Sequence, residues 1–500
     1  MEGKVHPKLM VIEAPEDEGE NSFIGNIGRG PRSRRTKKFK IITTMLHSME
    51  KKVLIIGAGL TGLVTAFYLK KRGIPFMVLD KKNEAGGVIK TYCEDGFCFE
   101  AGPNTGVISH PEVAELFEDL GDLCKLEIAD ESAKKRLIWK NGKWEAIPSG
   151  LIGAIRTPLF TMKDKIRILG EPFRKPGTNP DETLAALVRR RMGQSFLDYA
   201  VDPFVKGVYA GDTEYLIPRY ALPKLYRLEQ EYGSFVGGSI KKKMKEKDPR
   251  LKKATRKVFS AEGGLGNLIK ALVEACGSEN IFLDQKNIYV EKKEVAGFMV
   301  HYGEPGKEKS VETEKVITVT GSYALPSLLP FIEKPVMDKL NNLVYARVAE
   351  IAYGFKAWEG FKLDAFGGLV PSREKRDILG ILFPSAFLKN RAPANGALLT
   401  TFMGGISNDH LLDLPDEKLL QIASSEVQNM MQLESFRPDL VKIFRYQYAI
   451  PQYGLSTGER LKAIKETEAK YPGLTIAGNV RDGIGMADRI KQGVTIASLV

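Results

Sequence analysis

The chain has 500 residues, more than one hydrophobic core accommodates, so we expect about two or three domains, some of them built from discontinuous segments. An apolar fraction of 43% and a charged fraction of 27% are typical of a globular protein, and no run of about 18 apolar residues predicts a membrane-spanning helix. The formal net charge is +12, but no nucleic-acid-reading motif accompanies it, which disfavours nucleic acid as a partner. We therefore expect a cytoplasmic protein that contacts a membrane only peripherally.

The spacing of cysteines and histidines predicts no metal site. Cys93, Cys98, Cys124 and Cys276 match neither a metal-ligand spacing nor a disulfide framework, and the five histidines do not cluster. Cys93 and Cys98 flank a predicted hairpin turn, but reduced thiols are the favoured state in a cytosolic enzyme.

Residues 1–50 differ from the rest of the chain. An acidic patch at residues 16–20 is followed by a basic run at residues 32–40, without sustained periodicity. This composition predicts a disordered or appended extension, and it resembles neither a secretory signal nor a transit peptide.

Residues 51–62, KKVLIIGAGLTG, are predicted to form a buried strand that runs into a phosphate-binding turn. Gly57, Gly59 and Gly62 have the spacing G-x-G-x-x-G, in which the first glycine turns tightly, the second admits a pyrophosphate and the third lets a helix pack closely. A helical pattern follows, and residues 75–80 predict a second strand that ends in Asp80, where a ribose hydroxyl would be held. This order predicts a dinucleotide-binding Rossmann-like unit; a glycine-rich turn in another αβ unit is the alternative.

Two further glycine motifs narrow the choice of dinucleotide. Residues 84–87, EAGG, follow the acid, and residues 100–104, EAGPN, follow a predicted hairpin with Gly96 at its turn. This pattern resembles flavoprotein oxidases of the amine-oxidase type, in which a second pair of glycines lines the flavin. The resemblance favours FAD over NAD.

Between residues 111 and 257 the pattern changes from strands to helices. Residues 111–126 predict a helix that begins at a proline, and residues 136–144, RLIWKNGKW, predict a hairpin. Residues 151–257 contain short amphipathic helices, which we interpret as a helical insertion that forms a lid and a substrate wall. Ten basic side chains between residues 241 and 257 face only two acids, which predicts a solvated face or contact with anionic lipid or a polyanionic substrate.

The remaining segments complete the domains. Residues 258–320 and 470–500 are predicted to return to the unit begun by residues 51–150, whereas residues 321–469 predict a separate sheet with one long helix. The predicted fold is therefore α/β, with a discontinuous Rossmann-like FAD-binding domain, a mixed-sheet substrate domain and the helical insertion.

Motifs outside the nucleotide unit resemble the protoporphyrinogen oxidase family. They are GVYAGD at residues 207–212, LPKLYRLEQEYGS at 222–234, FGGLVP at 366–371, IPQY at 450–453 and AGNVRDGIGMAD at 477–488. The similarity spans residues 50–500 and implies oxidation of protoporphyrinogen IX to protoporphyrin IX in haem synthesis, with six electrons removed and oxygen as acceptor. The flavin would abstract hydride itself, so no catalytic side chain is implied.

The resemblance also implies a set of FAD-binding residues. The pyrophosphate would be held by Gly57, Ala58, Gly59, Leu60, Thr61 and Gly62, and the ribose by Asp80 and Lys81. The flavin would be lined by Gly87, Val88, Gly102, Pro103, Asn104 and Thr105, and the adenine would be contacted by Ile288 or Val290. The isoalloxazine would be contacted by Asn479, Ile484, Gly485 and Met486. The last cysteine, Cys276, lies far from the C-terminus, which indicates non-covalent FAD.

A porphyrinogen is a large apolar ring with propionates, so its slot should be aliphatic and aromatic with a cation at the rim. Phe366, Leu369 and Leu388 are candidate walls, and ordinary sheet core is the alternative for each of them. His110 and Arg391 are candidate cations, with Lys206 and Arg219 as further choices. No basic residue lies at positions 106–109, and Val88 stands where many relatives carry arginine, so this chain departs from the family there.

Several functions remain open at this point. Coproporphyrinogen III is an alternative substrate, and a flavin amine oxidase, a desaturase or a non-catalytic flavin subunit are alternative classes. The partners implied are the porphyrinogen, molecular oxygen, an anionic membrane surface and a ferrochelatase that receives the product.

Overall fold

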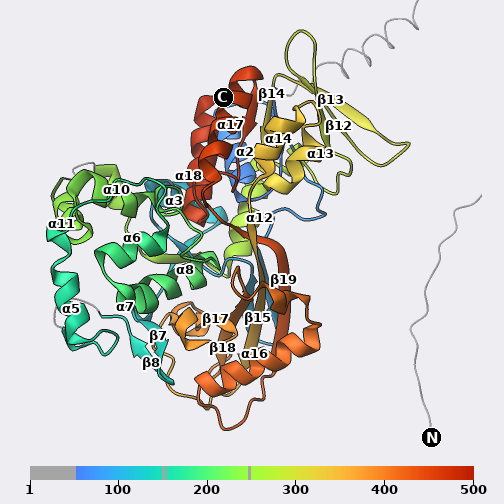
Figure 1. The fold of residues 1–500 in the computed structure, drawn as a ribbon. Helices are drawn as coiled ribbons and strands as arrows, with labels where there is room; N and C mark the ends of the chain where they lie inside the picture. Colours follow the sequence, from blue (N-terminus) through green and yellow to red (C-terminus); the bar gives the residue numbers. More distant parts are fainter. Residues whose placement is uncertain (1–51, 149–152, 154, 246–248) are drawn as a thin grey trace, which may run out of the picture. The chain divides into compact units, whose positions relative to one another are not determined.

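The computed structural model describes residues 52–148, 153, 155–245 and 249–500. Residues Glu50–Val500 form one compact unit. The extension expected at residues 1–50 lies outside the described residues. Figure 1 shows the course of the chain, coloured from its N-terminus to its C-terminus.

The first sheet has five parallel strands in the order β10-β2-β1-β14-β20. The strands β1 and β2 are buried on both faces, as their continuous apolar sequences predict. Helices α2, α12 and α18 pack against one face, and an antiparallel sheet of β11, β12 and β13 packs against the other. The strands are β1 (Val53–Ile56), β2 (Phe76–Leu79), β10 (Ile281–Phe282), β11 (Tyr289–Lys292), β12 (Phe298–Tyr302), β13 (Lys309–Thr313), β14 (Lys315–Thr318) and β20 (Leu474–Ile476), and the helices α2 (Leu60–Lys71), α12 (Leu265–Cys276) and α18 (Met486–Leu499).

The second sheet has seven strands in the order β19-β15-β18-β17-β16-β7-β8. All neighbours are antiparallel except β16 and β7, which run parallel. Helix α16 (Asp416–Met430) packs on one face of this sheet. The strands are β7 (Arg136–Lys140), β8 (Lys143–Ala146), β15 (Tyr345–Phe355), β16 (Gly367–Leu369), β17 (Ile378–Leu382), β18 (Ala397–Gly404) and β19 (Leu440–Pro451).

The hairpin β7–β8 corrects one expectation. Residues 51–150 are expected to belong with the nucleotide-binding segments, but β7 pairs with β16 of the second sheet. A hairpin fixes the pairing of its own two strands, whereas the outer edge can pair with any distant strand, so the sequence did not reveal this partner.

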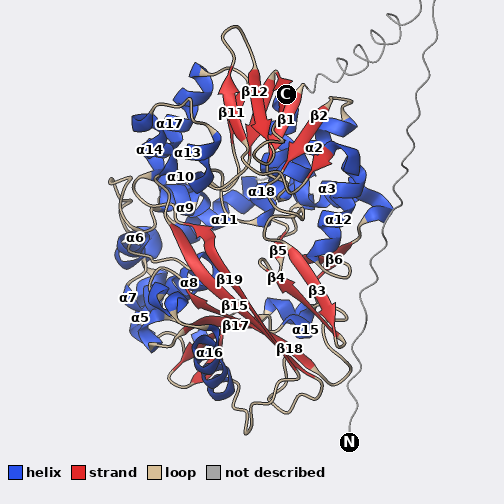
Figure 2. Cartoon of the chain, turned by 90° about the vertical axis from the view of Figure 1, so that its right-hand side faces the viewer, coloured by secondary structure: helices blue, strands red, loops and turns tan. Residues whose placement is uncertain are grey.

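Short strands connect the two sheets, and in Figure 2 β3 and β4 lie beside the long strands of the second sheet. Phe97 and Phe99 of β4 pack against Ala352 of β15, and a Cβ on Gly354 would stand 2.8 Å from the ring of Phe97. These strands are β3 (Lys90–Glu94), β4 (Phe97–Ala101), β5 (Gly106–Val107), β6 (Leu126–Ile128) and β9 (Val258–Ala261), and α3 (Pro111–Leu120) lies between β5 and β6.

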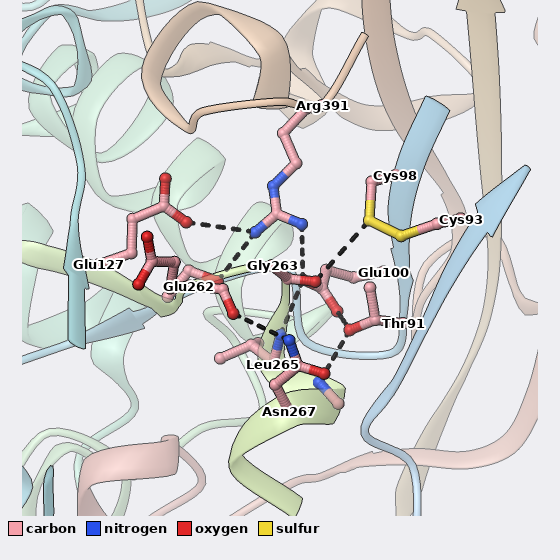
Figure 3. Close-up of a disulfide and its surroundings, with 12 residues drawn as sticks. Thr91, Cys93, Cys98, Glu100, Glu127, Glu262, Gly263, Leu265, Asn267 and Arg391 are labelled. Carbon is pink, nitrogen blue, oxygen red and sulfur yellow. Dashed lines mark hydrogen bonds and ion pairs between the residues drawn. A yellow bond between two sulfur atoms is a disulfide. The ribbon is translucent and has the colours of Figure 1, made fainter. Parts of the chain in front are cut away.

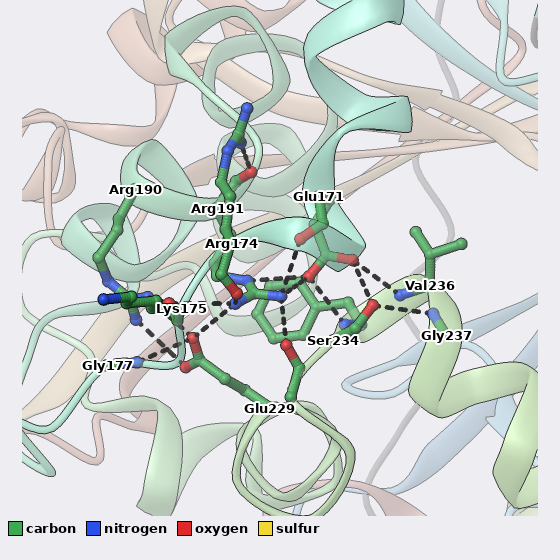
Figure 4. Close-up of polar contacts among 12 residues, drawn as sticks. Glu171, Arg174, Lys175, Gly177, Arg190, Arg191, Glu229, Ser234, Val236 and Gly237 are labelled. Atoms are coloured by element: carbon green, nitrogen blue, oxygen red, sulfur yellow. Dashed lines mark hydrogen bonds and ion pairs between the residues drawn. The ribbon is translucent and has the colours of Figure 1, made fainter.

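Residues 155–245 contain helices and no strand, which confirms the predicted helical insertion as part of the fold. A buried ionic cluster joins α6, α10 and α11 (Figure 4). Glu171, fully buried, pairs with Arg191 and accepts hydrogen bonds from the hydroxyl of Ser234 and the amide of Phe235. The helices are α5 (Met162–Leu169), α6 (Leu184–Arg191), α7 (Gln194–Phe196), α8 (Asp202–Tyr209), α9 (Pro218–Ala221), α10 (Pro223–Tyr232) and α11 (Phe235–Lys245).

Four more helices complete the described chain. They are α13 (Leu325–Leu328), α14 (Lys334–Asn341), α15 (Pro384–Phe387) and α17 (Thr457–Lys470). Of these, α14 packs against α17, beside the first sheet, and α15 packs against β18 of the second sheet.

Candidate functional site

The turn after β1 has the geometry that the glycine spacing predicts. Gly57 has a φ of +117°, and its N–H donates to the carbonyl of Leu79 at 2.8 Å. A Cβ on Gly62 would stand only 2.0 Å from the carbonyl oxygen of Gly57, so α2 can pack this closely only with glycine there. The first and third glycines are therefore required by the backbone itself.

The second glycine has a different role. Gly59 immediately precedes α2, and a Cβ there would meet no atom within 4 Å. The first turn of α2 carries no acidic side chain and no side chain caps the helix, so its first N–H groups have no partner within the helix. This space fits a pyrophosphate at a helix N-terminus, and Leu60 and Thr61, in the first turn of α2, lie beside it.

Asp80 closes the turn on one side. Its Oδ2 accepts a hydrogen bond from the amide of Ala58 at 2.6 Å, and its Oδ1 accepts one from the amide of Lys82 at 2.9 Å. The amide of Gln285 donates to the Asp80 carbonyl, so the segment leading to the partly buried Ile288 runs alongside. Lys81 is exposed at the same edge. The structure thus brings the segment that precedes Ile288 to the residues expected to hold the ribose.

The later glycine motifs also meet here. The amide of Gly86 donates to the Ala58 carbonyl, and a Cβ on Gly87 would stand 3.4 Å from the Cα of Gly59. Gly102 has a φ of +103°, and a Cβ there would stand 2.1 Å from the carbonyl oxygen of Val88. Residues 102–105, called here the 102–105 loop, therefore lie against the segment 86–88.

The C-terminal motif is held by tyrosines from the region of the second sheet. The hydroxyl of Tyr345 donates to Oδ1 of Asn479 at 3.1 Å, and the hydroxyl of Tyr453 lies 2.8 Å from the Asn479 carbonyl and 3.0 Å from that of Gly483. Gly485 precedes α18 and is exposed, Ile484 is partly buried, and Met486 is buried in the core beside α2. The tyrosine of the IPQY motif thus supports this loop.

The register of the second sheet shows which side chains share a face. Glu350 of β15 lies opposite Phe402 of β18 and Phe444 of β19. Phe402 in turn lies opposite Gly380 of β17, and Gly380 lies opposite Leu369 of β16. Paired residues point to the same side of a sheet, as do residues two apart along a strand. The resulting aromatic face, which is the one turned away from α16, includes Arg136, Leu369, Leu382, Phe402, Glu350, Phe444 and Tyr446.

Glu350 joins the aromatic face to the 102–105 loop. Its Oε2 accepts a hydrogen bond from the amide of Gly102 at 2.7 Å, and its Oε1 accepts one from Nδ2 of Asn104 at 2.5 Å. Burial raises the pKa of Glu350 to about 8 despite these two donors. Sequence reasoning missed this residue, because an acid in an otherwise apolar strand carries no motif.

The helical insertion covers the same face. A Cβ on Gly207 of α8 would stand 2.3 Å from Cδ2 of Leu369, and one on Gly211 would stand 2.5 Å from Oε1 of Gln452. The glycines of the GVYAGD motif therefore permit close approach to the FGGLVP and IPQY motifs. Leu369, a predicted wall residue, lies where the insertion meets the sheet.

The other predicted wall residues lie at the edge of the aromatic face. The rings of Phe366 and Phe387 stack at 4.7 Å, and the guanidinium carbon of Arg136 lies 5.6 Å from the centroid of Phe366. Leu388 is buried with Phe387 and Val258, so it is a core residue. Arg136, which sequence reasoning did not single out, is an exposed cation on this face.

The predicted cations have other partners. Arg391 is 2% exposed and lies 3.6 Å from Glu100, 3.5 Å from Glu127 and 3.2 Å from the hydroxyl of Ser260 (Figure 3). A guanidinium enclosed by two carboxylates cannot also stand at an open rim, which argues against Arg391 as a propionate anchor.

His110 is likewise engaged, because its Nε2 lies 3.1 Å from Oδ1 of Asp488. Lys206 is 4% exposed, with its pKa lowered by burial, and Arg219 pairs with Asp181. The structure therefore brings none of these basic side chains to the aromatic face as an open cation.

The expectation of reduced thiols at positions 93 and 98 was wrong. The two cysteines lie directly opposite each other on β3 and β4 and form a disulfide (Figure 3). The antiparallel register brings their Cβ atoms together, whereas the sequence spacing alone left the pairing open. Cys124 and Cys276 are free and buried.

The described residues contain neither a cluster of metal-ligating side chains nor a membrane-spanning helix. In residues 52–148, 153, 155–245 and 249–500 no group of three or more His, Cys, Asp or Glu side chains could hold a metal ion. Within that same part of the chain, no helix is long and apolar enough to cross a membrane.

Comparison with known families agrees with this geometry. The family model described as flavin containing amine oxidoreductase matches residues 60–500. The chain therefore belongs to the flavin-containing amine oxidoreductases, and membership implies a flavin cofactor.

Individual relatives narrow the resemblance further. The mitochondrial protoporphyrinogen oxidase of Nicotiana tabacum is 30% identical over 486 residues, which are 91% of this chain and 95% of that protein. The coproporphyrinogen III oxidase of Bacillus subtilis (strain 168) is 25% identical over 469 residues, covering 90% and 97% of the two chains. A solved candidate protoporphyrinogen oxidase from Exiguobacterium sp. 255-15 has a TM-score of 0.74 at 23% identity, covering 90% of this chain and 98% of that one. The resemblance to the protoporphyrinogen oxidase family is confirmed, and the predicted α/β fold class with it.

Proposed function

We propose that this flavin-dependent oxidoreductase binds FAD without a covalent bond and oxidises protoporphyrinogen IX to protoporphyrin IX, with oxygen as acceptor. The observation that carries the proposal is the contact between Glu350 and the 102–105 loop, which sets the predicted flavin residues against the aromatic face. A face that carries Phe402, Phe444 and Tyr446, with a cation at its edge, suits a large tetrapyrrole that carries carboxylates. The name of the tobacco relative supports this substrate class.

Each part of the chain has a task in this reaction. The amides at the start of α2 and the space beside Gly59 would hold the pyrophosphate, and Asp80 the ribose. Bound FAD supplies the hydride acceptor. The aromatic face would orient the macrocycle, and the helices packed on Leu369 would exclude water from it.

Arg136 is the residue that we propose as the propionate anchor. It is exposed, and its guanidinium stacks on Phe366. It lies on the aromatic face because it is two residues before Ile138, which pairs with Leu369. Arginine binds carboxylates in a bidentate manner and remains charged at every relevant pH. Arg136 therefore replaces His110 and Arg391 as the favoured cation.

Coproporphyrinogen III is the second candidate substrate. The Bacillus subtilis relative, whose name gives that substrate, matches nearly the whole chain. The two substrates share the tetrapyrrole core and differ in the number of propionates, so one open cation suits both.

The proposal is tested anaerobically. The purified yellow protein is mixed with protoporphyrinogen or with coproporphyrinogen, flavin bleaching is followed, and porphyrin fluorescence is recorded after air is admitted. Bleaching followed by fluorescence supports the reaction and identifies the preferred ring. If neither ring bleaches the flavin while an amine or a polyene does, the porphyrinogen assignment fails. If acid precipitation releases the yellow colour from the protein, the flavin is bound non-covalently; if the precipitate stays yellow, it is bound covalently.

We also propose a peripheral, cytoplasmic placement on an anionic membrane surface, where the product could pass to a ferrochelatase. Met162, Ile166 and Leu169 lie on one side of α5 and are 64 to 70% exposed, and the nearby Phe173 is 91% exposed. Exposed basic residues flank them: Arg156, Lys163, Arg167 and Lys175. An apolar helix face bordered by positive charge is typical of helices that lie in an anionic lipid interface.

A further inference from the structure

Glu350 occupies an unusual place in the second sheet. It lies in the middle of β15, between Phe402 and Phe444 on the neighbouring strands, and is 1% exposed. Removing a carboxylate from water is costly unless hydrogen bonds or charges compensate. The position is thus one where an apolar side chain would be more favourable for the sheet alone.

The compensation comes from one loop. Each carboxylate oxygen of Glu350 accepts one hydrogen bond, from the amide of Gly102 and from Nδ2 of Asn104. No cation forms an ion pair with Glu350 among the residues that the structure describes. The titratable groups that act on it are Glu100 on β4 and Tyr446 on β19, and neither supplies positive charge.

The loop is also confined from its other side. The left-handed backbone at Gly102 brings its Cα against the carbonyl of Val88, where a Cβ would approach within 2.1 Å. Gly102 is therefore enclosed between the segment 86–88 and the carboxylate of Glu350. A change in either contact must shift the backbone at residues 102–104.

We propose that Glu350 is a positioning residue that fixes the 102–105 loop in its FAD-binding conformation from the substrate sheet. The inference rests on the proposed flavin site and adds to it a residue outside every sequence motif of that site. It also links the second sheet to the 102–105 loop, because the aromatic face and the loop share this one side chain.

Protonation should weaken this hold. An ionised carboxylate accepts both hydrogen bonds, whereas a protonated one presents a hydroxyl to one of the two N–H donors. Burial raises the pKa of Glu350 to about 8, with Glu100 adding in the same direction, so the change falls near neutral pH. The affinity for FAD should therefore rise as pH rises through about 8.

The test is a titration of the FAD-free protein with FAD, followed by flavin fluorescence, at several pH values from about 6.5 to 9.5. The wild-type dissociation constant should fall by about tenfold across this range, which matches the loss of one hydrogen bond to a charged group. In Glu350→Gln the amide resembles the protonated carboxyl, because it offers one acceptor and one donor that faces an N–H donor of the loop. This variant should bind FAD about tenfold more weakly than the wild type at pH 9.5, and its affinity should show almost no pH dependence.

Two comparisons separate positioning from general damage. Tyr353→Phe removes a buried hydroxyl from the same strand. That hydroxyl lies 3.2 Å from Ser424, on the opposite face of the sheet from Glu350, so the variant should leave FAD affinity and its pH dependence unchanged. Asn104→Ala should weaken FAD binding, and its effect should not add to that of Glu350→Gln, because both remove one shared contact. If Glu350→Gln fails to fold, the wild-type pH series and Asn104→Ala still decide the question.

Equal affinities and equal pH profiles in wild type and Glu350→Gln would overturn the inference even if porphyrinogens reduce the flavin. Conversely, a protein that binds FAD with this pH dependence but is reduced by no porphyrinogen would overturn the proposed substrate and leave Glu350 its role. A wild-type protein that binds no FAD at all would overturn both.

Discussion

The hydroxyl of Tyr453 lies 2.8 Å from the carbonyl oxygen of Asn479, so a side chain that follows the last strand of the second sheet supports the loop that follows the last strand of the first. Tyr453 is almost fully buried, and burial raises its pKa well above the ordinary value, so the hydroxyl stays protonated and can donate. The two sheets are thus fastened by a neutral hydrogen bond.

Tyr453→Phe should lower the free energy of unfolding by about 1 to 3 kcal/mol, because the carbonyl of Asn479 loses its donor, whereas that of Gly483 keeps the Arg489 guanidinium. Thermal melts of the FAD-free and FAD-bound forms measure this, and the loss should be accompanied by weaker FAD binding. Tyr448→Phe, at a half-exposed ring, is the matched comparison. Equal melting temperatures for both variants and the wild type would contradict the supporting role.

Gly59→Val should abolish retention of FAD while leaving the fold intact, because a side chain there enters open space that the pyrophosphate is expected to occupy. Absorbance at the flavin bands and circular dichroism measure the two effects. Gly62→Val should instead prevent folding, since its side chain collides with the carbonyl of Gly57. A yellow Gly59→Val protein with full flavin content would refute the site.

Arg136→Gln should raise the KM for a porphyrinogen by about tenfold and leave kcat nearly unchanged, as expected when a ground-state carboxylate contact is lost. Steady-state kinetics with both rings measure this. Arg376→Gln is the control, because that guanidinium lies near Trp139 on the opposite face of the sheet. An unchanged KM in Arg136→Gln would remove this arginine from the substrate site.

The stability of the FAD-free protein should depend on pH through Glu350. Its folded-state pKa is about 8, raised by burial from the ordinary 4.5, so the folded chain keeps a proton that the unfolded chain releases between these values. The free energy of unfolding should therefore fall as pH rises from about 4.5 to 8, by up to about 5 kcal/mol from this group.

Urea unfolding at several pH values measures this slope, which Glu350→Gln should flatten and Tyr353→Phe should retain. The trend is opposite in sign to the predicted rise in FAD affinity, so one general pH effect cannot produce both. Parallel slopes in wild type and Glu350→Gln would show that another group dominates.

Replacing Ile166, Leu169 and Phe173 together by serine should reduce sedimentation with vesicles that contain phosphatidylserine by about fivefold or more, because the apolar face of α5 is lost. Val295→Ser, at a site that is 96% exposed beyond β11, controls for the loss of an exposed apolar side chain. Binding that is unchanged in the triple variant would exclude this face as the docking surface.

The parts of the site predicted from sequence are those that local geometry determines. The strand, the turn at Gly57 and the helix from Leu60 follow one another within a few residues, and each glycine meets a local steric demand. Asp80 follows the next strand, so its approach to Ala58 was also predictable from spacing.

The missed parts depend on contacts between distant segments. The hydrogen bonds of Glu350 to Gly102 and Asn104 join positions about 250 residues apart, and the pairing of β7 with β16 joins positions equally remote. Arg136 acquires its place on the aromatic face only through that pairing. No periodicity or motif in a single sequence specifies which strand edges meet, so these residues became visible only in the folded chain.

The parallel pairing of β7 with β16, and of β14 with β20, also has a consequence for biosynthesis. Both sheets contain strands from the early and the late parts of the chain, and neither is complete until residues 440–476 have left the ribosome. The two units therefore cannot mature one after the other during translation, as successive domains usually do. Until residues 440–476 have been synthesised, the earlier strands of both sheets therefore keep unpaired edges.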